Sequence, residues 1–208
     1  MVLRGSSRSS MEARKHADDV HTVGDRMAIK TKVRNRGRWL SEVVAPMKLY
    51  HGIELGTHRA AFADAILSAD AVQVLTCVDP WTGRFYPREN PEDRYKAALD
   101  RLEKHAGRTE IVRQKSLDVV DAFEDGSIDF IYIDALHVYE YPDGSGCNAD
   151  IKAYWPKVRS GGVFSGHDYY SRHGCGVIRA VTEFEEREGI QVNLTRNGAI
   201  PTWWVVKP

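Results

Sequence analysis

The stretch IDFIYIDALHVYE, residues 128–140, decides the expected fold. Its first six residues are mostly apolar or aromatic, which is typical of a strand buried on both faces of a sheet. The run ends in an aspartate, Asp134, and a histidine, His137, follows three positions later. A polar residue directly after a buried strand stands where open α/β sheets bind their ligands. We therefore expect both side chains in a functional crevice.

Short apolar runs recur on both sides of this stretch and alternate with amphipathic segments. The expected strands are residues 50–54, 73–78, 110–114, 128–133, 162–165, 190–194 and 203–206, and the expected helices are residues 59–69, 91–105, 148–155 and 177–187. This alternation predicts an α/β fold, with a seven-stranded, mostly parallel sheet and helices on both faces. Because only about eight residues separate the last two strands, we expect them to form a hairpin.

Composition excludes several classes of protein. No apolar run approaches the ~18 residues of a membrane span, so no membrane partner is expected. The three cysteines form no CxxC pair, which favours a reducing, cytoplasmic location. The net charge is zero, which makes nucleic acid an unlikely partner, yet residues 30–38, KTKVRNRGR, hold five basic side chains and no acid. A solvated basic segment is the more ordinary interpretation of that run.

Polar residues also follow the first three expected strands. The first ends in GIELGTHRA, where Glu54, Gly56 and Thr57 stand at the turn into a helix, and a glycine there lets the backbone approach a ligand closely. The second ends in CVDPW, whose Asp79 suits the two hydroxyls of a ribose. Ser116, after the third strand, either contacts a base or caps the next helix. A plain turn at Gly56 and a turn or capping role for Asp79 are the alternatives.

The fifth expected strand ends in GGVFSGHDYY. Because neighbouring strand ends share one rim of a parallel sheet, His167 and Asp168 should lie close to Asp134 and His137. Two carboxylates and two imidazoles can hold a divalent cation and still leave a base free. In the alternative interpretation, Asp134 caps the next helix and His167 is an ordinary hydrogen-bonded residue.

Taken together, these motifs resemble the class I S-adenosylmethionine-dependent methyltransferases, and more closely the branch of small-molecule and sugar O-methyltransferases with an IDAxHxYE motif. The resemblance spans about residues 48–207 and is carried by IELGTHRA, CVDPW, FIYIDALHVYE, DIKAYWPKVRSGGVFSGHDY and PTWWVVK. It implies a Rossmann-like sheet of strand order 3-2-1-4-5-7-6, with the methyl donor over the ends of strands one, two and four. Two residues depart from the pattern, since Ala60 replaces the last glycine of the cofactor loop and His167 replaces an acid.

The resemblance also implies a set of residues that bind the donor S-adenosyl-L-methionine: Glu54, Gly56, Thr57, Asp79, Ser116 and Asp134. Within this set, Glu54 and Gly56 would lie at the methionine portion, Asp79 would bind the ribose and Ser116 would approach the adenine. The resemblance makes Asp134 and His137 catalytic, with His137 as the base. In metal-dependent members the acids ending strands four and five are ligands, which implies a Mg²⁺ or Mn²⁺ site at Asp134, His167 and Asp168. The histidine at position 167 weakens that implication, so metal-free catalysis stays open.

The implied organisation has three parts: a disordered tail or expression remnant at residues 1–10, an N-terminal helical or cap segment at 11–47, and a methyltransferase domain at 48–208. The implied reaction is O-methylation of a small-molecule hydroxyl on a sugar or an aryl group, and a homodimer is possible. One alternative is aminopropyl transfer, or another nucleotide-cofactor reaction, on the same sheet. The other is a non-catalytic protein that binds RNA or another polyanion through residues 30–38.

An aromatic wall for the acceptor is the remaining expectation. Acceptor pockets in such folds come from the N-terminal segment and from loop insertions. The aromatic candidates are Trp81, Phe85, Tyr86, Tyr139, Tyr141, Tyr169 and Tyr170. Packing in the core or on the surface is the alternative for several of them.

Overall fold

The computed structural model describes residues 29–30, 32–82, 88–171, 174–196 and 200–208. The predicted tail at residues 1–10 and the first part of the predicted cap segment, residues 11–28, lie outside these ranges. Phe85, Tyr86 and the middle of the predicted hairpin loop also lie outside them.

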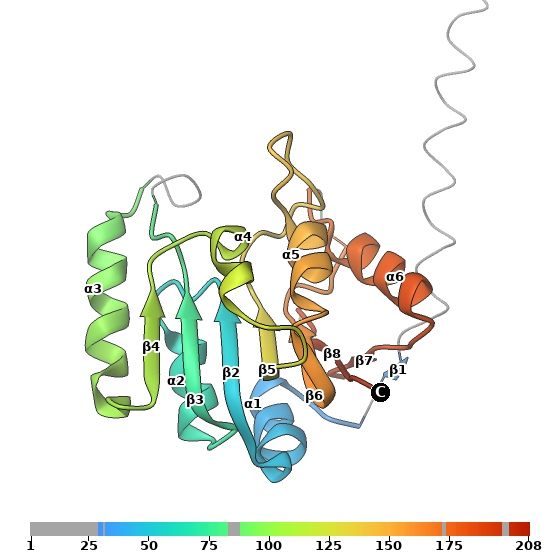
Figure 1. Cartoon of the computed structure of the whole chain (residues 1–208), viewed down its shortest axis with the longest axis horizontal. Helices are drawn as coiled ribbons and strands as arrows, with labels where there is room; N and C mark the ends of the chain where they lie inside the picture. Colours follow the sequence, from blue (N-terminus) through green and yellow to red (C-terminus); the bar gives the residue numbers. More distant parts are fainter. Residues whose placement is uncertain (1–28, 31, 83–87, 172–173, 197–199) are drawn as a thin grey trace, which may run out of the picture.

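One sheet forms the centre of the described structure (Figure 1). Its strands are β1 (Ile29–Lys30), β2 (Leu49–Leu55), β3 (Val72–Val78), β4 (Thr109–Val112), β5 (Ile128–Ile133), β6 (Val158–Gly166), β7 (Asn193–Leu194) and β8 (Trp203–Val206). They lie in the order β1-β7-β8-β6-β5-β2-β3-β4. Apart from β1, this is the predicted order 3-2-1-4-5-7-6, which is confirmed.

The direction of the strands also agrees with the prediction. β8 runs antiparallel to both β6 and β7, so the last two strands form the expected antiparallel pair. The other neighbouring strands are parallel. β1 was not predicted: it comes from the N-terminal segment and pairs with β7 at the edge of the sheet.

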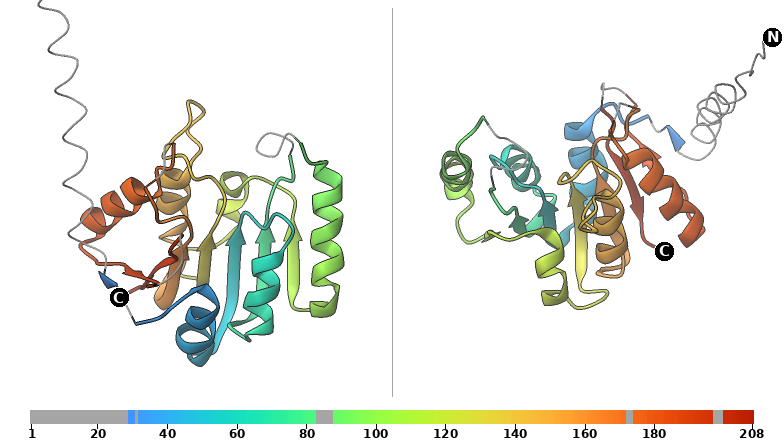
Figure 2. Two further views of the ribbon diagram at one scale, coloured as in Figure 1. Left: turned by 180° about the vertical axis from the view of Figure 1, so that it is seen from behind. Right: turned by 90° about the horizontal axis from the view of Figure 1, so that it is seen from above.

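The helices lie on both faces of the sheet. They are α1 (Arg36–Trp39), α2 (Ala61–Ser68), α3 (Pro91–Leu102), α4 (Ser116–Val119), α5 (Cys147–Tyr154) and α6 (Val177–Glu188). A π-helical turn (Leu40–Val44) and a 3₁₀ turn (Ala45–Met47) continue α1, and further 3₁₀ turns follow α3 (Glu103–His105) and α4 (Val120–Ala122). Figure 1 shows α4, α5 and α6 in front of the sheet, and the view from behind shows α1 and α2 on the opposite face (Figure 2).

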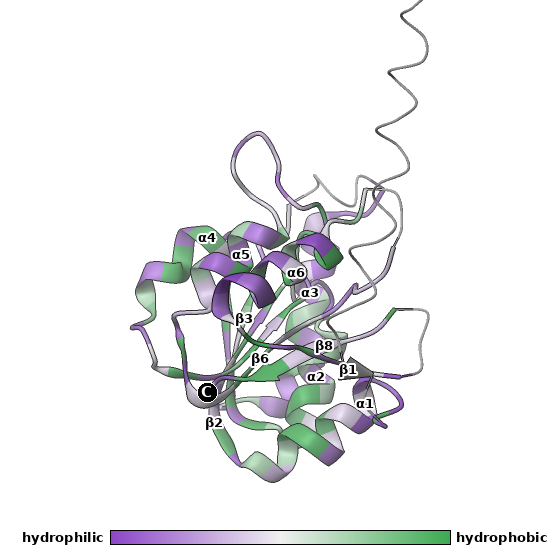
Figure 3. Cartoon of the chain, turned by 90° about the vertical axis from the view of Figure 1, so that its right-hand side faces the viewer, coloured by the Kyte–Doolittle hydropathy of each residue, from purple (hydrophilic) through white to green (hydrophobic). Residues whose placement is uncertain are grey.

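The alternation of side chains along β5 explains why residues 130–133 are apolar or aromatic at consecutive positions. Ile131 and Ile133 belong to the hydrophobic core beneath α5 and α6. Phe130 and Tyr132 belong to the core beneath α1 and α2. Successive strand residues point to opposite faces, so a strand with helices on both sides must be apolar at consecutive positions. Hydrophobic residues accordingly follow the strands, whereas the helices carry hydrophobic and hydrophilic residues in alternation (Figure 3).

Trp39 anchors the N-terminal segment to the sheet. Its side chain is fully buried, and its ring lies 5.8–6.0 Å from the rings of Phe130, Tyr132 and Trp204. The Asn35 side chain accepts a hydrogen bond from the Arg38 backbone N–H and so caps α1. The residue directly after the basic segment is therefore anchored in the core. Within the described residues, no helix is long and apolar enough to cross a bilayer.

Candidate functional site

A cavity of about 590 Å³ lies at the carboxyl ends of β2, β3 and β5. The chain leaves β2 toward β3 on one side, whereas β5 lies on the other side, so the cavity sits where the strand order reverses. Its volume falls within the range of small-molecule sites. Seven predicted site residues line it: Glu54, Gly56, Thr57, Asp79, Ser116, Asp134 and His137. Neither His167 nor Asp168 is among the lining residues.

Gly56 forms the tight turn after β2. Its φ is +90°, and its N–H donates a hydrogen bond of 2.8 Å to the carbonyl of Val78. A Cβ atom at this position would lie 2.2 Å from the carbonyl oxygen of Asp134. Both the backbone conformation and the close approach therefore require glycine. Ala60, which replaces the family's last glycine, is buried and also left-handed, with φ 56°, a conformation that costs an alanine about 1–2 kcal/mol.

Asp79 connects two loops at the edge of the cavity. Its two carboxylate oxygens accept hydrogen bonds from the backbone N–H groups of His58, at 2.9 Å, and Trp81, at 2.7 Å. The bond to Trp81 is the turn interaction considered above. The capping alternative is wrong, because residues 80–82 are not helical and the next helix of the described ranges begins at Pro91. The carboxylate still faces the cavity, where it can also accept hydrogen bonds from a ligand.

Glu54 places a carboxyl group at the floor of the cavity. The residue is 1% exposed, and its Oε2 atom has no hydrogen-bond partner among the described residues. Burial raises the pKa of Glu54 to about 8, and the neighbouring charge of Asp134 adds to the increase. A buried carboxyl oxygen without a hydrogen-bond partner is costly, and a cationic ligand in the cavity would relieve that cost.

Ser116 is the first residue of α4, and its hydroxyl donates to Oδ1 of Asp150 at 2.5 Å. Lys115 is the N-cap residue and its side chain makes no capping hydrogen bond, so the capping interpretation of Ser116 is wrong. Asp150, which the sequence interpretation missed, is 1% exposed, and burial raises its pKa to about 7. Because the hydroxyl hydrogen points to Asp150, the oxygen of Ser116 is left as an acceptor at the cavity wall.

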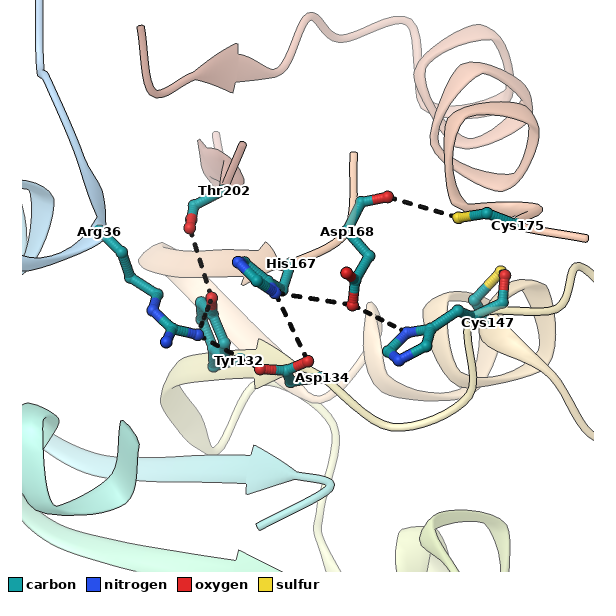
Figure 4. Close-up of polar contacts among 9 residues, drawn as sticks. Arg36, Tyr132, Asp134, Cys147, His167, Asp168, Cys175 and Thr202 are labelled. Carbon is teal, nitrogen blue, oxygen red and sulfur yellow. Dashed lines mark hydrogen bonds and ion pairs between the residues drawn. The ribbon is translucent and has the colours of Figure 1, made fainter. Parts of the chain in front are cut away.

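The ends of β5 and β6 bring together four side chains that we call the acid–imidazole cluster: Asp134, His137, His167 and Asp168 (Figure 4). Nδ1 of His137 lies 2.9 Å from Oδ2 of Asp168. Nδ1 of His167 lies 3.7 Å from Oδ1 of Asp134 and 3.6 Å from Oδ2 of Asp168. The alternative in which Asp134 caps the following helix is wrong, because α5 begins at Cys147.

Charge pairing sets the protonation of this cluster. The hydrogen bond to Asp168 raises the pKa of His137 above its usual value. Burial lowers the pKa of His167, but pairing with Asp134 and Asp168 outweighs burial and raises it to about 9. The pKa of Asp168 lies well below its usual range, because the two histidines outweigh the effect of burial. At neutral pH, His167 is therefore a cation between two carboxylates.

A metal ion would find three of these residues suitably placed. Ligand atoms of Asp134, His137 and Asp168 lie within 4.8 Å of one another. The predicted set contained His167 in place of His137, and that set stays a prediction. A metal on Nδ1 of His137 would displace Asp168 from that nitrogen, so the same histidine would not then be an Asp168-oriented base.

Arg36 joins the site from the N-terminal segment, and the sequence interpretation missed it. Its Nη1 atom lies 3.3 Å from Oδ2 of Asp134 and 3.4 Å from the hydroxyl of Tyr132. Its guanidinium lies 4.1 Å from the centroid of the Phe62 ring. The sequence feature that could have indicated this position is Trp39, three residues after Arg36. A tryptophan directly after a basic run indicates a helix face that packs on the core, and residues three apart lie on the same face.

Most of the described aromatic residues that were predicted to form an acceptor wall do not line the cavity. Trp81 is 1% exposed and packs edge-on against Tyr95, at 4.9 Å between centroids. Tyr139 lies beneath Arg179 and donates its hydroxyl hydrogen to Glu183. Among the predicted aromatic residues that the structure describes, only Tyr141 lines the cavity.

Residues 50–169 match the family model described as a methyltransferase domain. The fold is similar to that of the O-methyltransferase TomG from Streptomyces achromogenes, which is involved in tomaymycin synthesis and was solved in complex with SAM. The two sequences are 17% identical, the alignment covers 83% of this chain and 79% of that one, and the TM-score is 0.58. A putative caffeoyl-CoA O-methyltransferase from Staphylococcus aureus is 14% identical, with 95% and 92% covered and a TM-score of 0.58. Spermidine synthase from Thermotoga maritima is 16% identical, with 81% and 56% covered and a TM-score of 0.53. No curated protein matches the chain.

Proposed function

The chain belongs to the methyltransferase domain family, and we propose that it transfers a methyl group from S-adenosyl-L-methionine to a hydroxyl oxygen of a small molecule, either a sugar or an aryl compound. Support comes from a cavity of suitable size at the strand-order reversal, from the acids Glu54 and Asp79 in its lining, and from a histidine that a carboxylate orients at its edge.

The observation that carries the proposal is the 2.9 Å contact between Nδ1 of His137 and Oδ2 of Asp168. A carboxylate on Nδ1 keeps the hydrogen there in the neutral ring, which leaves Nε2 as the basic nitrogen. His137 lines the cavity and its side chain is 42% exposed, so Nε2 can reach a bound hydroxyl. Asp168 is nearly buried and acts through His137 rather than on the acceptor itself.

Each part of the donor can be matched to a lining residue by its hydrogen-bonding groups and charge. Asp79 would accept hydrogen bonds from the ribose hydroxyls, and Ser116 would accept one from the amino group of adenine. Glu54 would face the ammonium group at the amino-acid end of the donor, beside the close backbone turn at Gly56. The sulfonium carries the reactive methyl group, and the chain's task there is to align it with the acceptor oxygen.

In the reaction we propose, His137 removes the proton from the acceptor hydroxyl as the oxygen attacks the methyl carbon. The C–S bond breaks, its electron pair stays on sulfur, and S-adenosylhomocysteine leaves together with the methyl ether. Asp134, held by Arg36 and His167, would position the acceptor. Asp168 would stabilise the imidazolium that forms on His137, because its carboxylate lies 2.9 Å from Nδ1 of that ring.

A divalent cation remains part of the proposal as an alternative, because Asp134, His137 and Asp168 are spaced to hold one. When bound, such an ion would lower the pKa of the acceptor hydroxyl. We favour the metal-free form, because Arg36 and His167 already supply positive charge to the two carboxylates. Exhaustive chelation should therefore leave activity unchanged, and loss of activity that Mg²⁺ or Mn²⁺ restores would instead support the metal.

Two variants test the proposed division of roles. His137→Ala should lower turnover by about 10²- to 10⁴-fold while leaving the affinity for S-adenosylhomocysteine unchanged, because general-base catalysis contributes that much. Asp79→Ala should mainly weaken binding of S-adenosylhomocysteine in calorimetric titration. Equal loss of affinity in the two variants would contradict the assignment, and absence of any binding to the wild-type protein would refute the proposed donor.

Neither alternative function has an observation of its own in its favour. The basic segment was the proposed surface for a polyanion, but Arg36 turns into the cavity and Arg38 pairs with Glu42 at 2.8 Å. Aminopropyl transfer on the same sheet needs a donor without the α-carboxylate, and Arg36 lies where it can bind that carboxylate.

A further inference from the structure

The donor that we propose ends in an α-amino acid, which carries one positive and one negative charge. The inference below rests on that proposed function. Glu54 offers a carboxyl group for the amino end, as described above. A carboxylate of the ligand needs a cation at the same end of the cavity, and Arg36 lies there, close enough to Glu54 for each charge to affect the pKa of the other.

The position of Arg36 is fixed on three sides. Trp39, three residues along the same helical turn, is fully buried and holds the backbone of α1 against the sheet. The guanidinium stacks on Phe62, at 4.1 Å, and Phe62 belongs to α2, the helix that follows the cofactor loop. Nη1 bonds to Tyr132 and Asp134 at the end of β5. The side chain is therefore preorganised rather than free in solvent.

The hydrogen-bonding capacity of Arg36 is only partly used. Within the described residues its hydrogen bonds come from Nη1 alone, so the N–H groups on Nε and Nη2 are available. These two nitrogens form the edge of a guanidinium that binds a carboxylate with two parallel hydrogen bonds. The side chain is 36% exposed and lines the cavity, so a ligand can reach this edge.

We propose that Arg36 binds the α-carboxylate of the methyl donor and thereby selects S-adenosylmethionine against its decarboxylated form. Glu54 and Arg36 then form a complementary pair for the two charges of the amino-acid end. The segment that carries Arg36 becomes a wall of the donor site. The decarboxylated compound is the donor in aminopropyl transfer, and without a carboxylate it would leave the free edge of Arg36 without a partner.

The test compares two ligands that differ only in the carboxylate: S-adenosylhomocysteine and decarboxylated S-adenosylhomocysteine. In calorimetric titration the wild-type protein should bind the carboxylated ligand about 10- to 100-fold more tightly, as expected for a hydrogen-bonded charge pair. Arg36→Met should lose most of this preference, because it weakens binding of the carboxylated ligand only. Arg38→Met is the matched control, because Arg38 lies on the same helix, pairs with Glu42 and does not line the cavity, and it should keep the preference.

The outcomes separate this inference from the proposed function. If the wild-type protein binds S-adenosylhomocysteine but shows no preference, or if Arg36→Met keeps the preference, Arg36 is not the carboxylate ligand. If the wild-type protein binds neither ligand, the proposed function itself fails. The wild-type comparison requires no substitution, so absence of a preference would overturn the inference even if Arg36→Met does not fold.

Discussion

The two halves of the candidate site are built in different ways. The donor half, at the ends of β2 and β3, consists of Glu54, Gly56 and Asp79, and each of these residues stands in or directly after its strand. The acceptor half, at the ends of β5 and β6, depends on ion pairs within the acid–imidazole cluster, and Arg36 from the N-terminal segment links it to the donor half through Asp134. Backbone geometry shapes the first half, whereas charge balance between separate segments shapes the second.

This contrast teaches that the two halves should fail differently. A substitution at the backbone turn of the donor half should disturb the main chain and with it the stability of the fold. A substitution in the acceptor half should change protonation and orientation, so it should alter turnover while the fold survives. The variants below test that difference, from the largest expected effect to the smallest.

The largest effect is expected for Gly56→Ala, which should lower the free energy of unfolding by more than about 3 kcal/mol and abolish donor binding. The added Cβ would lie 2.2 Å from the carbonyl oxygen of Asp134. Gly107→Ala is the matched control: its φ is also positive, +82°, but nothing lies within 4 Å of the added atom. The control should cost only about 1 kcal/mol in urea unfolding. Equal losses would show that the close approach at Gly56 contributes nothing.

In the acceptor half, Asp168→Asn should lower turnover by about 10- to 100-fold, because it removes the carboxylate that orients His137. Asp168 raises the pKa of His137, and a base acts only when it is deprotonated. Without Asp168, that pKa falls, so the acidic limb of the pH–rate profile should move to lower pH. Glu183→Gln, outside the cavity, should leave the profile unchanged. A profile that does not move in Asp168→Asn would exclude His137 as the titrating base.

The smallest effect, when it is compared over one pH unit, is expected from Glu54. Burial raises the pKa of its carboxyl group to about 8. Between the ordinary value near 4.5 and about 8, the folded protein binds more protons at this residue than the unfolded chain does. Stability should therefore fall as pH rises through this window, by up to about 1.4 kcal/mol per pH unit. Glu54→Gln should flatten that dependence in urea unfolding, whereas the exposed Glu42→Gln should not. An unchanged slope in Glu54→Gln would mean that this carboxyl group ionises freely in the fold.

The sheet and much of the donor half could be predicted from the residue pattern. The consecutive apolar and aromatic residues at 130–133 predict a strand covered on both faces, and the residues after parallel strands meet at one edge, because such strands share their direction. The family resemblance supplied the strand order. Gly56 and Asp79 were identifiable because their positions follow from the strand ends beside them.

The remaining features of the site depend on long-range contacts that only the folded chain makes. No local pattern could show that Arg36 reaches Asp134, 98 positions away, or that Ser116 bonds to Asp150 rather than capping its own helix. The protonation of His167 likewise depends on the two carboxylates that folding places beside it. The physical reason is range: strand periodicity and turn geometry are set by neighbours in the chain, whereas burial and charge pairing depend on which distant segments meet.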